Sequence, residues 1–310
     1  MKSTLLILGE CMLELSGDPA DGSLRSSFAG DCCNAAIYAR RWSGQLAVYF
    51  ATAVGEDSVS DAMLADWREE GLDCSTVLRT PKAVPGAYLI HTDDTGERSF
   101  IYWRANSAAT LWPQLLRESG GIDSLPAASY VFFSGVSLGI LAAEDRRWLL
   151  DALASLRDGG AKIAFDPNYR SALWRDVAEA ADWLTQAYRV CDIALPGLDD
   201  HLNVFGHRGL EEVYVALGDL GVGEVVVKCG LEGVFASHAG SELVHLPFEP
   251  APIQVDSTSA GDSFAGTYLA SRLAGADLGE ALQAACDVSR LVVQHPGAIV
   301  PMDTYRQHFS

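Results

Sequence analysis

Asp256-Ser-Thr-Ser-Ala-Gly-Asp-Ser-Phe264 is the stretch that decides the fold, because it joins a polar, glycine-containing turn directly to a helix. The apolar residues Phe264, Tyr268 and Leu269 have the spacing of one helix face. The first N–H groups of a helix have no partner within it, and the positive end of its dipole lies there. We therefore expect an anion site at this turn, with phosphate as its usual occupant.

Asp262 places a carboxylate in the same turn. In one interpretation it is a general base that takes a proton from a hydroxyl as a phosphoryl group arrives. In the other it only caps the helix, a position that Asp and Ser favour. The turn alone leaves both interpretations open.

Composition narrows the class of protein. A chain of 310 residues, 49% hydrophobic, can bury the core of one large α/β domain. Its net charge of -19 argues against nucleic acid and membrane surfaces as partners. Only four lysines occur, so arginine must supply most of the positive charge that an anionic substrate needs. Seven scattered cysteines without C-x-x-C, and no signal peptide or membrane-spanning run, predict a reducing, cytoplasmic compartment.

Apolar runs alternate with helical stretches along most of the chain. This alternation predicts a doubly wound, mainly parallel sheet flanked by helices, with ligands beyond the carboxyl ends of its strands. The expected strands are 4–9, 46–54, 130–134, 162–166, 192–195 and 224–228. The expected helices begin near 29–34 and cover 60–70, 144–156, 210–220, 263–273 and 278–293.

Two pairs of β-rich runs interrupt this alternation. Runs 87–92 and 98–103, joined by 93–97, predict a hairpin that cannot belong to a parallel core. Runs 234–238 and 242–246 predict a second hairpin, whereas residues 15–25 read as a loop. We expect a single domain over 1–310, with a β lid built from about 11–30 and 84–108 standing over the crevice.

Three further motifs carry candidate site residues. Tyr102 and Arg104 lie two apart on one strand face, where they can grip a carboxylate or polyol, or simply pack together. Asp166-Pro-Asn-Tyr-Arg170 follows a strand, so Asn168 and Arg170 face the crevice or form an ordinary polar turn. Lys228-Cys-Gly230 ends another strand, where the lysine contacts a nucleotide or reaches solvent.

A different class of enzyme is also open. Gly135-Val-Ser-Leu-Gly139 matches G-x-S-x-G after a strand, with Ser137 as nucleophile and Asp262 and His295 as partners. No oxyanion loop of the HGGG type precedes it. The chain has neither the phosphate-binding G-x-x-x-x-G-K-[ST] nor a G-x-G-x-x-G motif.

The opening stretch resembles the D-T-x-x-A-G-D-x-F signature of the pfkB, or ribokinase-like, carbohydrate kinases. Further matches are Gly9-Glu10, the A-G-D-x-x-N segment at 29–34, Val54-Gly55-x-Asp57 and the 166–170 loop, in order over nearly the whole chain. The resemblance implies a ribokinase-like fold and phosphorylation of a sugar by ATP with Mg²⁺.

Within the family, the chain is most similar to the members that act on 2-keto-3-deoxygluconate. The stretches that carry this similarity are 9–16, 95–104 and 134–138, together with the 166–170 loop. This implies phosphorylation of the 6-hydroxyl of a sugar acid, and it agrees with two arginines converging in so negative a protein. A kinase for a neutral sugar such as fructose or ribose, a non-catalytic sugar sensor and the serine hydrolase are the alternatives.

The resemblance also implies the site residues. Asp262 is the expected base, and the backbone of Ala260, Gly261 and Asp262 is the expected anion hole. Expected to hold the sugar acid are Gly30, Asp31, Asn34, Tyr88, Tyr102, Arg104, Arg170 and Asp262. Expected to face ATP are Asn168, Arg170, Lys228, Gly230, Ser259, Ala260 and Gly261.

The chain departs from the family pattern at three places. Ser257 replaces the threonine of the signature, and Ala29-Gly30 replaces a Gly-Gly pair. The N-x-x-E segment linked to magnesium is not intact after strand 192–195, which leaves Asp199 and Asp200 as candidate metal ligands. Lids in this family often form dimer contacts, so the resemblance also implies a homo-oligomer through the lid.

Overall fold

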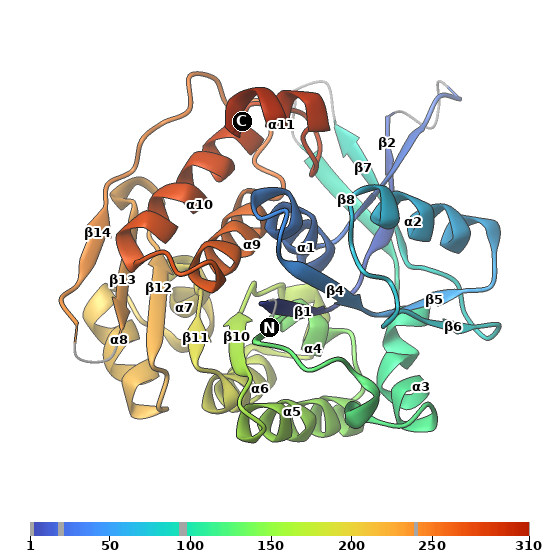
Figure 1. The fold of residues 1–310 in the computed structure, drawn as a ribbon, viewed down its shortest axis with the longest axis horizontal. Coiled ribbons are helices and arrows are strands. Elements are labelled where there is room, and N and C mark those ends of the chain that lie inside the picture. Colours follow the sequence, from blue (N-terminus) through green and yellow to red (C-terminus); the bar gives the residue numbers. More distant parts are fainter. Residues whose placement is uncertain (1–2, 18–21, 93–97, 239–240, 310) are drawn as a thin grey trace.

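The computed structural model describes residues 3–17, 22–92, 98–238 and 241–309. Its largest sheet has eight strands in the order β14-β13-β12-β11-β10-β9-β1-β4 (Figure 1). Neighbours from β12 to β4 are parallel, whereas β13 and β14 are antiparallel at one edge. The strands are β1 (Thr4–Leu8), β4 (Ala47–Ala51), β9 (Tyr130–Ser134), β10 (Lys162–Asp166), β11 (Ile193–Ala194), β12 (Glu224–Lys228), β13 (Val234–His238) and β14 (Val244–Leu246).

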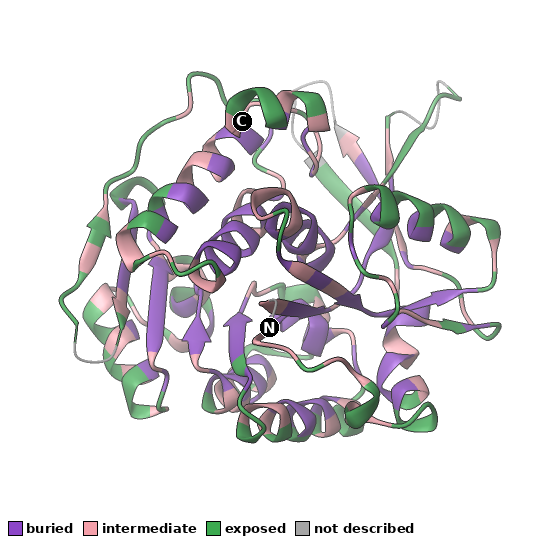
Figure 2. Ribbon diagram, in the orientation of Figure 1, coloured by how far each residue is buried: buried purple, intermediate pink, exposed green. Residues whose placement is uncertain are grey.

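Helices cover both faces of this sheet, and its apolar strands are buried from both sides (Figures 1 and 2). Along β1, Leu5 and Ile7 belong to one core cluster and Leu6 and Leu8 to the other. The first face carries α1 (Asp31–Trp42), α2 (Ser58–Glu69), α9 (Ala260–Leu273) and α10 (Leu278–Val292). The second carries α3 (Trp112–Glu118), α5 (Ala143–Asp158), α6 (Val177–Val190), α7 (Leu198–Phe205) and α8 (Leu210–Asp219).

Shorter elements complete the chain. They are α4 (Gly135–Gly139), α11 (Met302–Phe309) and the 3₁₀ turns η2 (Ala108–Leu111), η3 (Ile122–Ser124), η4 (Ser171–Leu173) and η5 (Gly230–Glu232). Within the described residues, no helix is apolar over enough of its length to cross a bilayer.

A second sheet has the order β3-β2-β7-β8 and lies beside the large one (Figure 1). Its strands are β2 (Met12–Ser16), β3 (Arg25–Ala29), β7 (Ala87–Thr92) and β8 (Arg98–Trp103). The antiparallel β7–β8 pair is the hairpin expected outside the parallel core. Its predicted turn, 93–97, lies outside the described residues. β2 joins the hairpin by pairing in parallel with β7, so strand structure extends into the part expected as a loop.

One predicted strand was wrong. The run 46–54 splits at Thr52 into β4 and β5 (Ala53–Gly55), and β5 pairs instead with β6 (Leu78–Thr80). The Thr52 carbonyl accepts a hydrogen bond from the Leu78 N–H, so the chain changes partners at this residue. A continuous apolar run does not reveal such an exchange of strand partners.

Candidate active site

The N-terminus of α9 forms the floor of the candidate site. The helix begins at Ala260, three residues earlier than expected, and Ser259 before it adopts a left-handed φ of 65°. The Ala260 N–H makes a long 3.3 Å bond to the Ser257 carbonyl. In the described part of the chain, the N–H groups of Gly261 and Asp262 have no partner. These amides form the anion site that the turn predicts.

Asp262 does not cap its helix. Its Oδ2 accepts a 2.9 Å hydrogen bond from Nδ2 of Asn34, a buried residue in the first turns of α1. The two helices come this close because Gly266 has no side chain: a Cβ there would lie 2.0 Å from the Ala35 carbonyl oxygen. The capping interpretation is therefore wrong, and the carboxylate is directed toward α1.

The surroundings of Asp262 tune its acidity. Loss of water around the carboxyl, followed by the charge of Asp31, raises the pKa of Asp262 to about 7, against the hydrogen bond from Asn34. Arg170 acts in the lowering direction, which places its guanidinium within electrostatic reach. A carboxyl group with a pKa close to neutral is suited to act as a general base at that pH.

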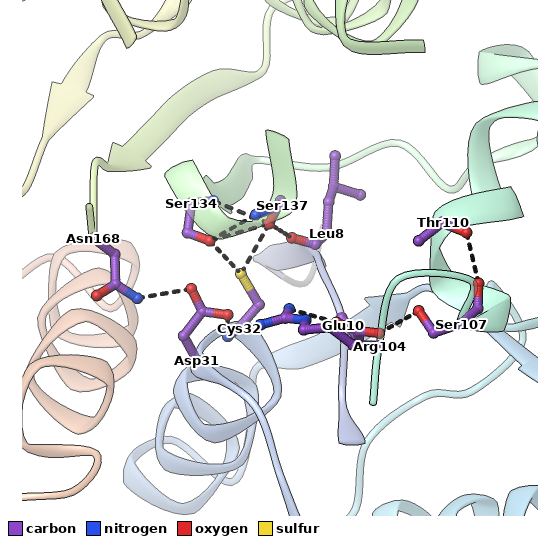
Figure 3. A network of polar contacts seen from close by, with 10 residues as sticks. All are labelled: Leu8, Glu10, Asp31, Cys32, Arg104, Ser107, Thr110, Ser134, Ser137 and Asn168. Carbon is purple, nitrogen blue, oxygen red and sulfur yellow. Dashed lines mark hydrogen bonds and ion pairs between the residues drawn. The ribbon is translucent and has the colours of Figure 1, made fainter. Parts of the chain in front are cut away.

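Asp31 and Asn168 connect α1 with the 166–170 loop (Figure 3). Nδ2 of Asn168 donates a 2.8 Å hydrogen bond to Oδ2 of Asp31. Asn168 has a φ of 34°, and it and Ser259 are the two non-glycine residues with positive φ in the described chain. Backbone strain of this kind concentrates at functional sites. Here the Asn168–Asp31 bond holds the strained loop against α1.

Lys228 lies between the loop and the anion site. Its Nζ donates a 2.6 Å bond to Oδ2 of buried Asp166, whose Oδ1 accepts from the Asn168 N–H at 3.1 Å. A Cβ on Gly261 would lie 3.8 Å from this Nζ. The ammonium group therefore stands beside the free amides of α9, where it can hold a phosphate.

A cavity of about 490 Å³ opens beside these groups. It brings together four of the residues expected to face ATP, namely Lys228, Gly230, Ala260 and Gly261. Phe264 and the apolar segment around Phe248 form other parts of its wall. The size and the mix of apolar surface with few polar groups are typical of a nucleotide site. Asn168, Arg170 and Ser259 do not line it.

A second group of expected residues lies on the smaller sheet, on β7, on β8 and directly after β8. Tyr102 is half exposed and packs against Tyr88 with tilted rings whose centroids are 5.6 Å apart, and the Arg104 guanidinium lies 5.9 Å from the Tyr102 ring centroid. Arg104 also pairs with buried Glu10, and the Tyr88 hydroxyl donates a hydrogen bond to the Glu14 carboxylate. Figure 3 shows the Arg104–Glu10 pair near Asp31, whose charge acts on Glu10.

The remaining expected residues contribute in different ways. Arg170 is exposed and donates to the Tyr169 carbonyl at 3.0 Å. Gly30 is needed for packing, because a Cβ there would lie 2.2 Å from the Glu10 carbonyl oxygen. Of the two candidate metal ligands, Asp199 is exposed, whereas the Asp200 carboxylate accepts from the N–H groups of Tyr169 and Gly197. Burial and then the charge of Asp166 raise the pKa of Asp200.

The hydrolase interpretation is wrong. Ser137 is buried at 4% exposure, and its hydroxyl donates a 2.8 Å bond to the Leu8 carbonyl. Its other partners are Ser134 and Cys32, as Figure 3 shows. In the described chain no histidine contacts it, so no base is available to activate it.

Three acidic residues were not among the expected site residues. Glu10 pairs with Arg104, Glu14 accepts from Tyr88, and Asp166 pairs with Lys228. Asp166 ends β10, and Glu10 follows β1 after one glycine, so both occupy the carboxyl ends of parallel strands. That position is the signal that could have identified them.

Comparison with known proteins agrees with this geometry. A 2-dehydro-3-deoxygluconokinase from Escherichia coli K12 is 38% identical over 307 residues, 98% of this chain and 99% of its own. One from Dickeya dadantii is 37% identical, covering 96% of this chain and 97% of its own. A putative ribokinase II from E. coli, solved with ATP and Mg²⁺, has a TM-score of 0.83 at 25% identity, over 96% of this chain and 94% of its own.

The model of the pfkB family carbohydrate kinases matches residues 2–305. The predicted fold class is confirmed, because the structural neighbours share the mainly parallel sheet flanked by helices. The family predicted from the opening stretch is confirmed as well. With Asp262 in the first turn of α9 and the family signature around it, the chain belongs to the pfkB family of carbohydrate kinases.

Proposed function

We propose that the protein is a 2-dehydro-3-deoxygluconokinase, which transfers the γ-phosphoryl group of ATP to the 6-hydroxyl of 2-keto-3-deoxygluconate. The observation that carries the proposal is the Asp262 carboxyl, held by the Asn34 side-chain amide at 2.9 Å beside two free backbone amides of α9. The relatives that are 36–38% identical over nearly the full length of both chains bear this name, which supports the choice of a sugar acid.

Asp262 is the proposed base. It takes the proton of the acceptor hydroxyl as the bond from that oxygen to the γ-phosphorus forms. The bond from this phosphorus to the bridging oxygen breaks at the same time, and ADP leaves. The hydrogen bond from Asn34 holds the carboxylate in place for the transfer.

The free amides of Gly261 and Asp262 and the Lys228 ammonium would hold the charge of the moving phosphoryl group. In the described chain no three His, Cys, Asp or Glu side chains gather into a metal site. We propose that the nucleotide phosphates would carry Mg²⁺ and that Asp200, which contacts the 166–170 loop through the Tyr169 N–H, would assist. When bound, it neutralises phosphate charge.

The sugar acid's carboxylate is proposed to lie against Arg104 and Arg170. Arg104 lies over the Tyr102 ring, and Arg170 acts on Asp262, so the two guanidinium groups flank the proposed position of the sugar. Guanidinium groups bind carboxylates through paired N–H donors, which a neutral sugar cannot use in the same way.

The second sheet is proposed as a lid over the sugar, within a single domain of 1–310. Its edge strand β8 exposes Phe100, Ile101 and Trp103 by 44–56%, on both faces. Such an apolar edge strand invites pairing with a second copy of the chain. We therefore propose a homodimer through β8, which light scattering of the protein with and without a Trp103→Lys substitution would test.

A reducing, cytoplasmic setting belongs to the same proposal. All seven cysteines are free. Five of them are buried, Cys11, Cys32, Cys33, Cys191 and Cys229. A compartment that keeps thiols reduced suits such a set.

The test is release of ADP from ATP and Mg²⁺ over a panel of aldonic acids, keto-deoxy gluconate and galactonate, fructose and ribose. We expect the highest kcat/KM for 2-keto-3-deoxygluconate. A higher value for fructose or ribose would overturn the sugar-acid assignment. Binding of sugar without any ADP release would overturn the kinase.

A further inference from the structure

We propose that Glu10 is a positioning residue for substrate recognition, which holds the Arg104 guanidinium in place to receive the substrate's carboxylate. The inference rests on the carboxylate-binding role proposed above for Arg104. It adds Glu10, which has no function in that proposal.

The contacts around Glu10 hold its carboxylate in a single arrangement. The residue is 1% exposed, and each oxygen has a different partner: Oε2 accepts from Nη2 of Arg104, and Oε1 accepts from the Ser107 hydroxyl (Figure 3). A Cβ on Gly86 would lie 2.9 Å from Oε1 and 3.1 Å from the Arg104 Cβ. Glu10 is therefore tightly enclosed by residues that come just before and just after the β7–β8 hairpin in the sequence.

The contacts of Glu10 join the core of the large sheet to the second sheet. Glu10 follows the carboxyl end of β1, a strand of the large sheet in which Leu5 to Leu8 are at most 2% exposed. Arg104 follows β8 directly, and Ser107 precedes η2, where Thr110 donates a 2.7 Å bond to the Ser107 carbonyl. A rigid strand end thus fixes a side chain that the smaller sheet contributes.

The Arg104 side chain gains its order from this pair. A free arginine side chain has roughly 2 kcal/mol of rotamer entropy to lose on ordering. The ion pair on one side and the Tyr102 ring on the other remove much of that freedom before a ligand arrives. A guanidinium has five N–H donors, and the Nε donor has no partner in the described chain, so the group retains capacity for an acceptor.

The pair also lies close to the reacting end of the site. The charge of Asp31 acts on Glu10, and the same Asp31 is the main charge that raises the pKa of Asp262. Burial raises the pKa of Glu10, whereas the Arg104 cation and the Ser107 hydroxyl act in the opposite direction. The charge of Asp31 therefore acts on both the partner of the carboxylate-binding arginine and the proposed base.

The experiment is a double-mutant cycle with Glu10→Gln and Arg104→Leu, read as KM for 2-keto-3-deoxygluconate and for its uncharged methyl ester. We expect Glu10→Gln to raise KM for the acid about tenfold, the effect of one lost hydrogen bond to a charged group. KM for the ester should change less than about twofold, because the ester has no charge to place. In the Arg104→Leu background, Glu10→Gln should have no further effect on KM for the acid.

Glu224→Gln is the matched control. Glu224 is also buried, at 2% exposure, and pairs with an arginine, Arg272, and a tyrosine, Tyr268, at the other end of the sheet. We expect it to lower the melting temperature and leave KM for the acid unchanged. Ser107→Ala provides a second variant if Glu10→Gln does not fold, with about a threefold rise in KM that Arg104→Leu again abolishes.

Each possible outcome either supports the positioning role of Glu10 or overturns it. Equal rises in KM for acid and ester, or additive effects in the double variant, would overturn the positioning role. A raised KM with Arg104→Leu and none with Glu10→Gln or Ser107→Ala would overturn it while leaving Arg104 in the site. An unchanged KM with Arg104→Leu would overturn the proposed role of Arg104 itself, and this inference with it.

Discussion

The side-chain amide of Asn34 donates a 2.9 Å hydrogen bond to the carboxylate of Asp262 and so joins the N-terminal turns of α1 and α9. The two residues are 228 positions apart in the chain. Asp31, at the start of α1, holds the 166–170 loop through Asn168, and α9 offers its free amides. One contact between helices therefore connects the proposed sugar side of the site with the proposed phosphate side.

Asp262→Asn should lower kcat by at least about 10²-fold, because the amide keeps the shape of the side chain and loses its basicity. The dissociation constant for ATP should change little, since the amides of α9 remain. Steady-state ADP release and nucleotide titration measure the two quantities. Turnover close to that of the unchanged protein would remove Asp262 from the mechanism.

The same substitution should stabilise the protein at alkaline pH. The pKa of Asp262 in the folded protein, about 7, lies above the value of about 4 usual for an unfolded chain. The folded state thus binds the proton more tightly, and this contribution is complete below about pH 4 and lost as pH rises to about 7. Melting temperatures at pH 8 and pH 5 should show a larger gain for Asp262→Asn at pH 8, whereas equal gains would contradict the raised pKa.

Asp31→Asn should move the acid limb of the kcat/KM profile to lower pH. That limb reports the base in the free enzyme, and activity falls as pH drops through its pKa. After burial, the charge of Asp31 is the main cause that raises the pKa of Asp262, so its removal lowers that pKa. Asp277→Asn, at the N-cap of α10 and exposed, is the control that should leave the limb in place. An unshifted limb in Asp31→Asn would show that another group titrates.

The sequence pattern predicts the sheet better than it predicts the site's charge pairs. The expected runs 130–134, 162–166, 224–228 and 234–238 coincide with β9, β10, β12 and β13, because each is a short apolar run with polar or glycine boundaries. The start of α9 lies three residues before the expected one, because Ala260, Gly261 and Asp262 carry no apolar periodicity.

The charge pairs follow from tertiary structure. Glu10 and Arg104 are 94 residues apart, and Asp166 and Lys228 are 62 apart. No spacing rule links residues at such separations, because the order of strands in the sheet decides which ends become neighbours. The resemblance to the pfkB kinases points to Arg104 and Lys228 as site residues. Glu10 and Asp166 lie in segments that match the family pattern, but nothing in that pattern pairs them with these two cations.

Lys228→Met should raise KM for ATP about tenfold, as expected for the loss of one charge-assisted contact to phosphate. It also leaves the buried Asp166 carboxylate without its 2.6 Å partner, so the melting temperature should fall. Lys162→Met is the matched control, because Lys162 is exposed at the other end of the β10 strand that Asp166 ends. An unchanged KM for ATP in Lys228→Met would remove the lysine from the nucleotide site.

Gly266→Ala should damage both stability and turnover. The new Cβ would lie 2.0 Å from the Ala35 carbonyl oxygen, so α9 must move away from α1. Overpacking of this kind destabilises by about 1–3 kcal/mol. The shift also separates Asp262 from Asn34, and we expect kcat to fall about tenfold while KM for ATP stays within a factor of about two.

Gly218→Ala provides the control for that substitution. Gly218 lies within α8, and a Cβ there meets nothing within 4 Å. Alanine in a helix is more favourable than glycine by up to about 1 kcal/mol, so this variant should melt at a higher temperature with unchanged kcat. A Gly266→Ala variant that is as stable and as active as Gly218→Ala would show that the α1–α9 contact can loosen without consequence, and that the Asn34–Asp262 hydrogen bond does not depend on it.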